Sequence, residues 1–249
     1  MSRYFIKLSY DGTHYHGWQS QDNAVTIQSG LEKALSIIIS EEIEVTGAGR
    51  TDTGVHAREY FAHFDLDKKL SDEEKKDIVY RLNAILSKDI SVSEIIDVEA
   101  SAHARFSAVS RTYKYYISKT KNPFNKEYSW FVYGNIDVVK MKEASKILFE
   151  YTDFTSFSKL HTDVKTNNCK IMYAEWNEEN DMLIFTIKAD RFLRNMVRAI
   201  VGTLVDVGKG KISLDDFRKI IENKNRSDAG YSVPAKGLFL EKIEYPFIV

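Results

Sequence analysis

The sequence predicts an α+β protein of two lobes with a central cleft, each lobe a mostly antiparallel sheet with helices on one face. Three observations lead to this prediction. Segments that alternate like strands interleave with segments of helical spacing, several strands follow one another as hairpins, and a similar order of elements recurs later in the chain. We expect lobes at residues 1–107 and 108–249, as a pseudo-repeat of the split βαβ, or ferredoxin-like, kind.

The first lobe is expected to run strand, helix, strand, strand, helix, strand. Tyr4, Ile6, Leu8 and Tyr10 alternate as in a half-buried strand, and Thr26 is placed to cap a helix at 27–38. The remaining elements are a short strand near 43–45, a glycine-rich turn at 47–54, a strand at 60–66, a helix at 71–86 that opens with a Ser-x-x-Glu capping box, and a strand at 90–98.

The second lobe repeats this order loosely, without close sequence identity to the first. Tyr113, Tyr115 and Ile117 share one face of a strand, and a helix follows through 141–148. Strands at 171–176 and 183–189, a long helix at 192–207, a helix capped at Ser213 and a last strand at 237–243 complete it.

Composition points to a globular cytoplasmic protein. The amino terminus lacks an export signal, no apolar stretch is long enough to cross a bilayer, and the single cysteine, Cys169, excludes an internal disulfide. The formal net charge of −1 at first argues against a polyanionic partner. Basic residues are nevertheless segregated, in two groups: Arg105, Arg111, Lys114, Lys119, Lys121 and Lys126, then Arg191, Arg194 and Arg198. From charge alone, ordinary solvated faces are the favoured interpretation of these two groups.

Neither a metal nor a cofactor is expected. His14 and His16 are two residues apart, but neither a cysteine nor a helical histidine pair completes a zinc set, so satisfied loop histidines are the simpler interpretation. The chain contains no dinucleotide fingerprint and no carboxylate cluster suited to paired magnesium ions.

The most informative segment runs from Gly47 to Ala57 and reads Gly-Ala-Gly-Arg-Thr-Asp-Thr-Gly-Val-His-Ala. Its glycines predict a tight turn between two strands that aims Arg50 and Asp52 out of the sheet. It is not a phosphate-binding loop, because the Lys and Ser or Thr that should follow the last glycine are missing. From spacing alone, a residue that merely caps a turn is the slightly favoured interpretation of Asp52.

The same segment resembles the catalytic motif of the tRNA pseudouridine synthase A family, Gly-Arg-Thr-Asp-Ala-Gly-Val-His. Further matching segments stand in the family's order over nearly the whole chain: Asp11 to Thr13, Tyr15 to Gln19, His103 to Ala108, Ser110 to Tyr115, Asp153 to Phe157, Met196 to Gly202 and Pro234 to Leu238. The resemblance implies conversion of uridine to pseudouridine in the anticodon stem-loop of tRNA, at positions 38 to 40, by a homodimer. The target base must be flipped out of its stack.

The resemblance also implies roles for individual residues. Asp52 is the nucleophile, since a carboxylate can form and release a covalent adduct. Arg50 fills the gap left by the flipped base, where the alternative is a surface charge. Tyr113 stacks on the target uracil, where the alternative is a core aromatic of a strand. Arg198 lies in an apolar helix and pairs with Asp52, keeping that carboxylate ionised.

Three further residues are expected to bind substrate. Leu238 corresponds to an apolar residue that lines the uracil pocket, and a place in the core is compatible with that role. Arg58 and Arg111 are the remaining candidates. The chain departs from the family at Thr53, where alanine is usual, at Tyr60 and Phe61, where glutamine and valine are common, and at 231–233. These departures bear on target choice.

Two other functions are compatible with parts of the sequence. An RNA-binding module without catalysis would use the same split βαβ sheets, but its glycine-aromatic signature is absent and both Asp52 and Tyr113 are present. A hydrolase acting through Asp52 would need a second carboxylate or a metal beside it. The prediction is therefore a two-lobed isomerase that binds tRNA.

Overall fold

The computed structural model describes residues 1–159 and 166–248. The chain falls into two compact units. The first consists of residues 1–109 together with 240–249, and the second of residues 110–239. None of the helices in the described residues is both long and apolar enough to cross a membrane.

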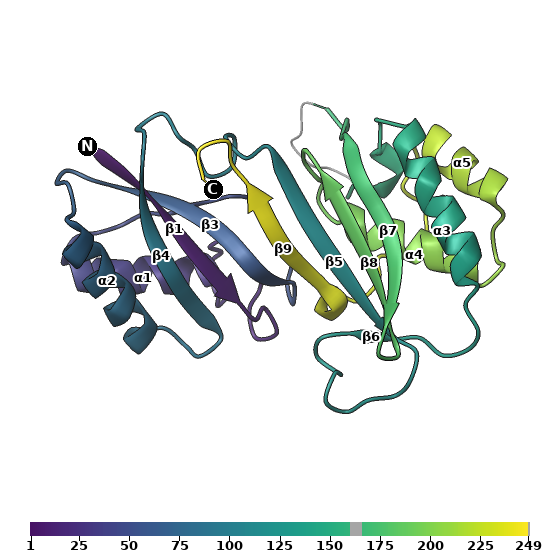
Figure 1. Ribbon diagram of the computed structural model, residues 1–249, viewed down its shortest axis with the longest axis horizontal. Helices are drawn as coiled ribbons and strands as arrows, with labels where there is room; N and C mark the ends of the chain where they lie inside the picture. The colour runs from purple at the N-terminus through teal and green to yellow at the C-terminus, as the bar shows by residue number, and fades with distance from the viewer. Residues whose placement is uncertain (160–165, 249) are drawn as a thin grey trace. The chain divides into compact units, whose positions relative to one another are not determined.

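The first unit is an antiparallel sheet with two helices. Its elements are β1 (Ser2–Tyr10), α1 (Ile27–Ile39), β2 (Thr46–Gly47), β3 (His56–Leu66), α2 (Asp72–Ile85) and β4 (Ile90–Val98). The central strand β1 pairs antiparallel with β3 on one side and β4 on the other, and β2 pairs with β3. The helices α1 and α2 lie together against these strands (Figure 1).

Local sequence explains where these helices begin. Thr26 accepts a hydrogen bond from the N–H of Ser29 and so caps α1. Ser71 and Glu74 form the reciprocal capping box predicted for α2. One face of α1, with Ile27, Leu31, Ala34, Leu35 and Ile38, is buried.

The carboxyl-terminal segment belongs to the first unit because it covers an apolar strand residue there. Phe5 of β1 is fully buried, and its ring meets the rings of Tyr245 and Phe247 edge-on, with centroids 5.2 and 5.7 Å apart. The hydroxyl of Tyr245 donates to the carbonyl of Ala104 over 2.6 Å. These contacts bury the face of β1 that carries Phe5. The opposite face, which carries Tyr4 and Ile6, is buried too.

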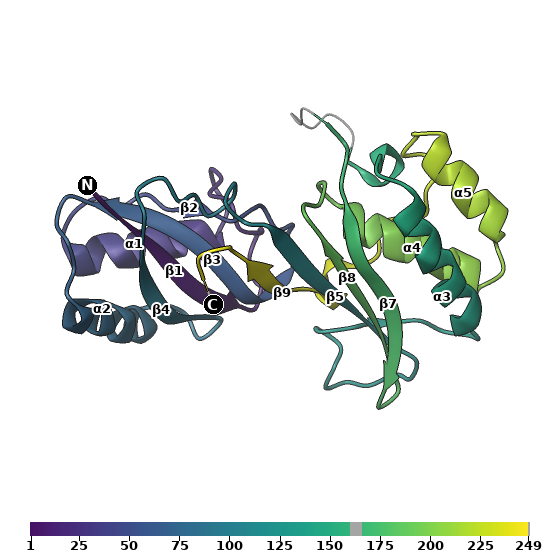
Figure 2. The same ribbon diagram turned by 45° about the horizontal axis from the view of Figure 1, so that its top comes forward.

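The second unit is also mainly antiparallel. Its elements are β5 (Ser110–Ser118), β6 (Trp130–Phe131), α3 (Val138–Ile147), β7 (Ile171–Glu179), β8 (Met182–Ala189), α4 (Met196–Gly208) and α5 (Leu214–Glu222). The strand order is β5-β8-β7, with β6 parallel to the end of β5. The helices α3, α4 and α5 lie on one side of these strands (Figure 2). The last strand, β9 (Leu238–Glu244), starts here and ends in the first unit.

Two turns in the second unit depend on residues that tolerate positive φ. Asn180 and Asp181, both at positive φ, form the two-residue turn of the β7–β8 hairpin. Asn195, at φ 69°, precedes α4, so this helix begins at Met196. Ser213 and Asp216 form a capping box that starts α5, as expected for Ser213.

The α+β class with mostly antiparallel strands is confirmed, and so is the order of elements predicted for the first 100 residues. Several elements differ in position from expectation, and the strand predicted from residue 60 already begins at His56. The short strand predicted near 43–45 is Thr46–Gly47, because pairing with Ala62 and His63 of β3 fixes its position. The long helix predicted from 192 begins four residues later, after Asn195. The central cleft and the lobe boundary after residue 107 stay predictions. The compact units differ from the predicted lobes because residues 240–249 belong to the first unit.

Candidate active site

The segment Gly47–Gly54 connects β2 to β3 and carries Arg50 and Asp52, and it is called the catalytic loop here for the role proposed for Asp52 below. The N–H of Val55 donates to the carbonyl of Asp52 over 3.1 Å, which closes a turn with Gly54 at φ 76°. Only glycine adopts that backbone angle cheaply. The side chain of Arg50 is exposed and that of Asp52 is partly exposed. The expected tight turn that presents these two residues is therefore present.

A second segment, Asp11–Gln19, packs directly against the catalytic loop. The backbone N–H of Trp18 donates to the carbonyl of Thr51 over 3.3 Å. A Cβ atom on Gly17 would lie 2.3 Å from that same carbonyl oxygen, and one on Gly12 would lie 2.0 Å from the carbonyl oxygen of Val55. These close approaches explain why glycines at both positions accompany the Asp52 motif.

Three aromatic side chains line the inner side of the catalytic loop. The hydroxyl of Tyr10 lies 2.9 Å from the Oγ1 atom of Thr51. The rings of Trp18 and Tyr60 stack with centroids 4.1 Å apart, and the hydroxyl of Tyr60 bonds to the backbone of Gly49. From the sequence, Tyr60 is a strand residue and a departure from the family, and nothing in the linear pattern connects it to Gly49.

Arg58 also belongs to the first unit, on the strand that follows the catalytic loop. Its side chain is 59% exposed, and its Nε atom lies 3.0 Å from a carboxylate oxygen of Glu241. His56, two residues earlier, is buried, and its Nδ1 atom lies 3.1 Å from the backbone nitrogen of Gly12 and 3.0 Å from a carboxylate oxygen of Asp11. The imidazole thus connects the start of β3 to the Asp11–Gln19 segment.

The other predicted residues lie in the second unit. Tyr113 stands on β5 opposite Ile187 of β8, is partly exposed, and meets the ring of Phe192 edge-on at 5.2 Å. On the same strand the guanidinium group of Arg111 donates to the carbonyl of Asp190 over 2.9 Å. Phe192 is a neighbour of Tyr113 that sequence reasoning did not identify.

Arg198 lies in the first turn of α4 and is held from the segment before β9. Its Nε atom donates to the carbonyl of Val233 over 2.7 Å, and Val233 donates its N–H to the carbonyl of Arg198 over 3.3 Å. Its neighbours Val197 and Ala199 are buried, whereas Arg198 is partly exposed. The guanidinium group therefore has a fixed direction at the start of an otherwise apolar helix.

Leu238 begins β9 and is buried, which is compatible with a role in the core and in a pocket wall. Nearby, the hydroxyl of Tyr115 donates to the carbonyl of Pro234 over 2.8 Å. Burial raises the pKa of Tyr115 far above its usual value, so this hydroxyl stays protonated. The Pro-Ala-Lys-Gly-Leu segment is thus fastened to β5, the strand that carries Tyr113.

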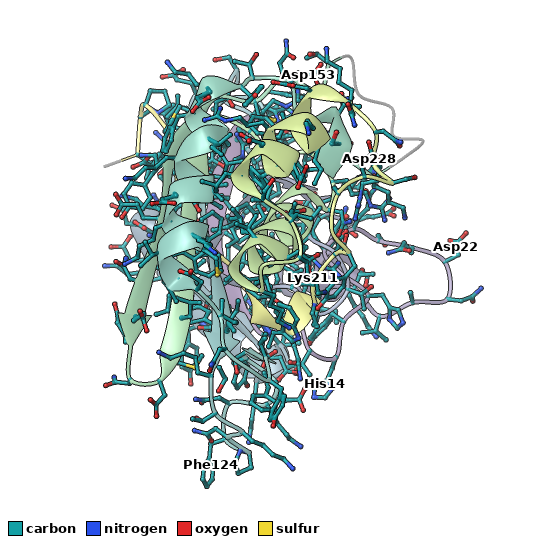
Figure 3. The ribbon with its side chains drawn as sticks, turned by 90° about the vertical axis from the view of Figure 1, so that its right-hand side faces the viewer. His14, Asp22, Phe124, Asp153, Lys211 and Asp228 are labelled. Carbon is teal, nitrogen blue, oxygen red and sulfur yellow. The ribbon has the colours of Figure 1, made fainter. Side chains whose placement is uncertain are left out.

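Within residues 1–159 and 166–248, no three His, Cys, Asp or Glu side chains gather closely enough to hold a metal ion. His14 and His16 are exposed loop residues, and Figure 3 shows His14 at the surface.

Comparison with known proteins identifies the class to which this fold and loop belong. A family model described as tRNA pseudouridine synthase matches residues 7–107 and 150–246. The matched residues include the catalytic loop, Arg198 and Leu238. Pseudouridine synthases are isomerases.

Relatives over the full length specify the family further. The tRNA pseudouridine synthase A of Bacteroides fragilis is 58% identical over 247 residues, covering 99% of this chain and 97% of that protein. The proteins of the same name from Bacillus licheniformis and Thermoanaerobacter pseudethanolicus are 44% and 42% identical, over 96% and 98% of this chain and 97% and 100% of those proteins. The chain belongs to the tRNA pseudouridine synthase A family.

Proposed function

We propose that this chain converts uridine to pseudouridine in the anticodon stem-loop of tRNA, with Asp52 as the nucleophile. Family membership over the whole chain supports the reaction class. The observation that supports Asp52 is its place in a loop whose backbone is bonded at Gly49 and at Thr51, just before Asp52, while Asp52 itself stays partly exposed.

The reaction exchanges one bond to the ribose for another. The bond between N1 of uracil and C1′ breaks, a bond between C5 and C1′ forms, the hydrogen on C5 leaves as a proton, and N1 gains one. A duplex hides these atoms, so the uridine is first flipped out at a cost of roughly a few kcal/mol. Asp52 then forms a transient covalent bond to the substrate, at C1′ or at C6, which divides one difficult step into two easier ones.

Residues of the first unit are proposed to hold the flipped state. Arg50 stands exposed two residues before Asp52, so its planar guanidinium group can occupy the space that the base leaves and contact phosphate. Arg58 is exposed on the adjoining strand, and its guanidinium group is proposed to bind backbone phosphate with Glu241 orienting it.

Residues of the second unit are proposed to act on the base. Tyr113 stacks on the uracil and assists loss of the C5 proton, and its edge-on contact with Phe192 supports a fixed ring orientation. Leu238 contributes apolar surface to the uracil site. Arg198 favours the ionised form of Asp52, and Arg111, on the strand of Tyr113, contacts RNA.

The assembly and the compartment belong to the same proposal. By resemblance the enzyme is a homodimer that grips one tRNA across both subunits. It acts in the cytoplasm, where its tRNA substrate is available. Sedimentation equilibrium should give twice the chain mass of 28.7 kDa, and a single-chain mass at micromolar concentration would contradict the dimer.

The decisive experiment measures tritium released from tRNA labelled at C5 of uridine, because isomerisation expels that hydrogen whichever atom Asp52 attacks. The wild-type chain should release tritium, and Asp52→Asn should lower the rate by at least about a thousandfold while binding tRNA nearly as well. Turnover by Asp52→Asn comparable to wild type would refute the nucleophile. Tight binding of tRNA by the wild-type chain without release would favour an RNA-binding module.

A further inference from the structure

We propose that Tyr60 is a positioning residue whose hydroxyl sets the backbone of the catalytic loop, and thereby the placement of Asp52. This role rests on the proposed function of Asp52. Tyr60 belongs to β3, eight residues after Asp52, so its side chain reaches back across the turn to the loop that precedes its own strand.

The hydroxyl of Tyr60 bonds to both backbone groups of Gly49. Gly49 donates its N–H to the hydroxyl oxygen of Tyr60 over 3.2 Å, and that hydroxyl donates to the carbonyl of Gly49. Gly49 directly precedes Arg50 and lies three residues before Asp52. Fixing both backbone groups of Gly49 therefore fixes the point from which the loop carries these two side chains outward.

The ring of Tyr60 has no freedom to move the hydroxyl elsewhere. Only 1% of the residue is exposed, its ring stacks on Trp18 at 4.1 Å, and Tyr10 meets it edge-on at 5.6 Å. Tyr10 and Trp18 also hold Thr51, the residue that follows Arg50. The hydroxyl of Tyr10 bonds to the side chain of Thr51, and the backbone N–H of Trp18 donates to its carbonyl. The three aromatic residues thus form one rigid support for the loop.

Gly47 shows how closely the loop is fitted to this support. A Cβ atom at Gly47 would lie 2.3 Å from the hydroxyl oxygen of Tyr60 and 2.4 Å from the Nε1 atom of Trp18. No side chain fits there without displacing one of the two rings. The hydroxyl is therefore wedged between the backbone at Gly47 and the backbone at Gly49.

Removal of the hydroxyl alone separates positioning from packing. Tyr60→Phe keeps the ring stacked but leaves the N–H and the carbonyl of Gly49 without this partner, so the loop gains freedom. A displacement of about 1 Å can cost on the order of a hundredfold in rate when the reacting atoms must be aligned. Substrate binding depends on many other contacts and should change little.

Tyr4→Phe is the matched control. Tyr4 is fully buried on β1 of the same unit, and its hydroxyl also bonds to two backbone groups, accepting from Leu70 over 2.7 Å and donating to Lys68 over 3.4 Å. We expect Tyr60→Phe to lower kcat for tritium release at least about tenfold, with KM for tRNA within about twofold. Tyr4→Phe should lower Tm by about as much as Tyr60→Phe does, and it should leave kcat and KM unchanged.

Hydrogen–deuterium exchange of residues 47–54 gives a readout that needs no catalysis. Exchange should quicken about tenfold or more in Tyr60→Phe and stay as in wild type in Tyr4→Phe. Unchanged exchange in Tyr60→Phe, or a kcat as high as that of Tyr4→Phe, would overturn the positioning role. If the wild-type chain releases no tritium, the proposed function fails, and exchange alone still decides whether Tyr60 holds the loop.

Discussion

A single residue of β3, His63, holds a neighbouring segment of the first unit by accepting a backbone hydrogen bond inside the core. Its Nδ1 atom accepts from the N–H of Ala104 over 3.2 Å. An imidazole nitrogen can accept only when it carries no proton. Burial, with Arg3 and His103 adding positive charge nearby, lowers the pKa of His63 to about 4. His63 is therefore a neutral structural group at physiological pH.

Stability should consequently fall as the solution becomes acidic. Because the folded pKa of His63 is about 4 and the unfolded value is 6.5, only the unfolded chain binds a proton between these values. The contribution of His63 is complete above the unfolded pKa and is lost progressively as pH falls toward 4. At about pH 5 the free energy of unfolding should be about 2 kcal/mol lower than at about pH 7.

Urea unfolding at the two pH values, for wild type and His63→Gln, measures this effect. Glutamine keeps a hydrogen-bond acceptor but cannot titrate, so the variant should lose most of the difference. An equally strong pH dependence in both proteins would show that other groups carry it.

At the scale of the elements, two helical glycines have opposite surroundings. A Cβ atom on Gly202 of α4 would lie 2.1 Å from the carbonyl oxygen of Tyr231, in the segment that holds Arg198 through Val233. A Cβ atom on Gly30 of α1 would meet only the Cδ1 atom of Ile90, at 3.9 Å. Helix α4 therefore needs glycine for close packing, whereas α1 does not.

The two glycines give a matched pair of substitutions. Gly202→Ala should lower the free energy of unfolding by about 1–3 kcal/mol, since backbone must shift. Gly30→Ala should raise it by roughly 0.5–1 kcal/mol, because alanine restricts the unfolded chain without strain in the helix. Guanidinium unfolding of both variants tests this, and stabilisation by Gly202→Ala would contradict the packing of α4.

For the whole molecule, the net charge of −1 gives little indication of the proposed partner. Attraction to a polyanion depends on where positive groups are placed, and the proposed RNA contacts at Arg50, Arg58 and Arg111 are cationic. Phosphate contacts displace counterions from the nucleic acid, so salt opposes binding even when the protein is neutral overall.

Affinity for tRNA should therefore fall at least about tenfold between roughly 50 and 200 mM salt, as two or more phosphate contacts require. Filter binding over a salt series measures the slope of log Kd against log salt. Arg50→Gln should make the slope shallower, whereas Lys76→Gln, an exposed change on α2, should not. Affinity independent of salt would exclude phosphate contacts as the main source of binding.

Features that depend on neighbours along the chain can be predicted from the amino-acid sequence. The capping box at Ser71, the helix cap at Ser213 and the periodic strands and helices are predictable, because their hydrogen bonds and spacing are local. The Asp52 loop was recognisable for the same reason, as a contiguous motif whose glycine at position 54 adopts the positive φ that the turn needs.

Features that depend on partners distant in sequence are defined only in the folded chain. Pairing with β3 moved the short strand to Thr46–Gly47, and contacts with Phe5 brought the carboxyl terminus to the first unit. Tyr60, which sequence alone marked as a departure, proved to bond to Gly49. Such contacts follow from which side chains face each other once the sheet has formed, and no local pattern encodes that.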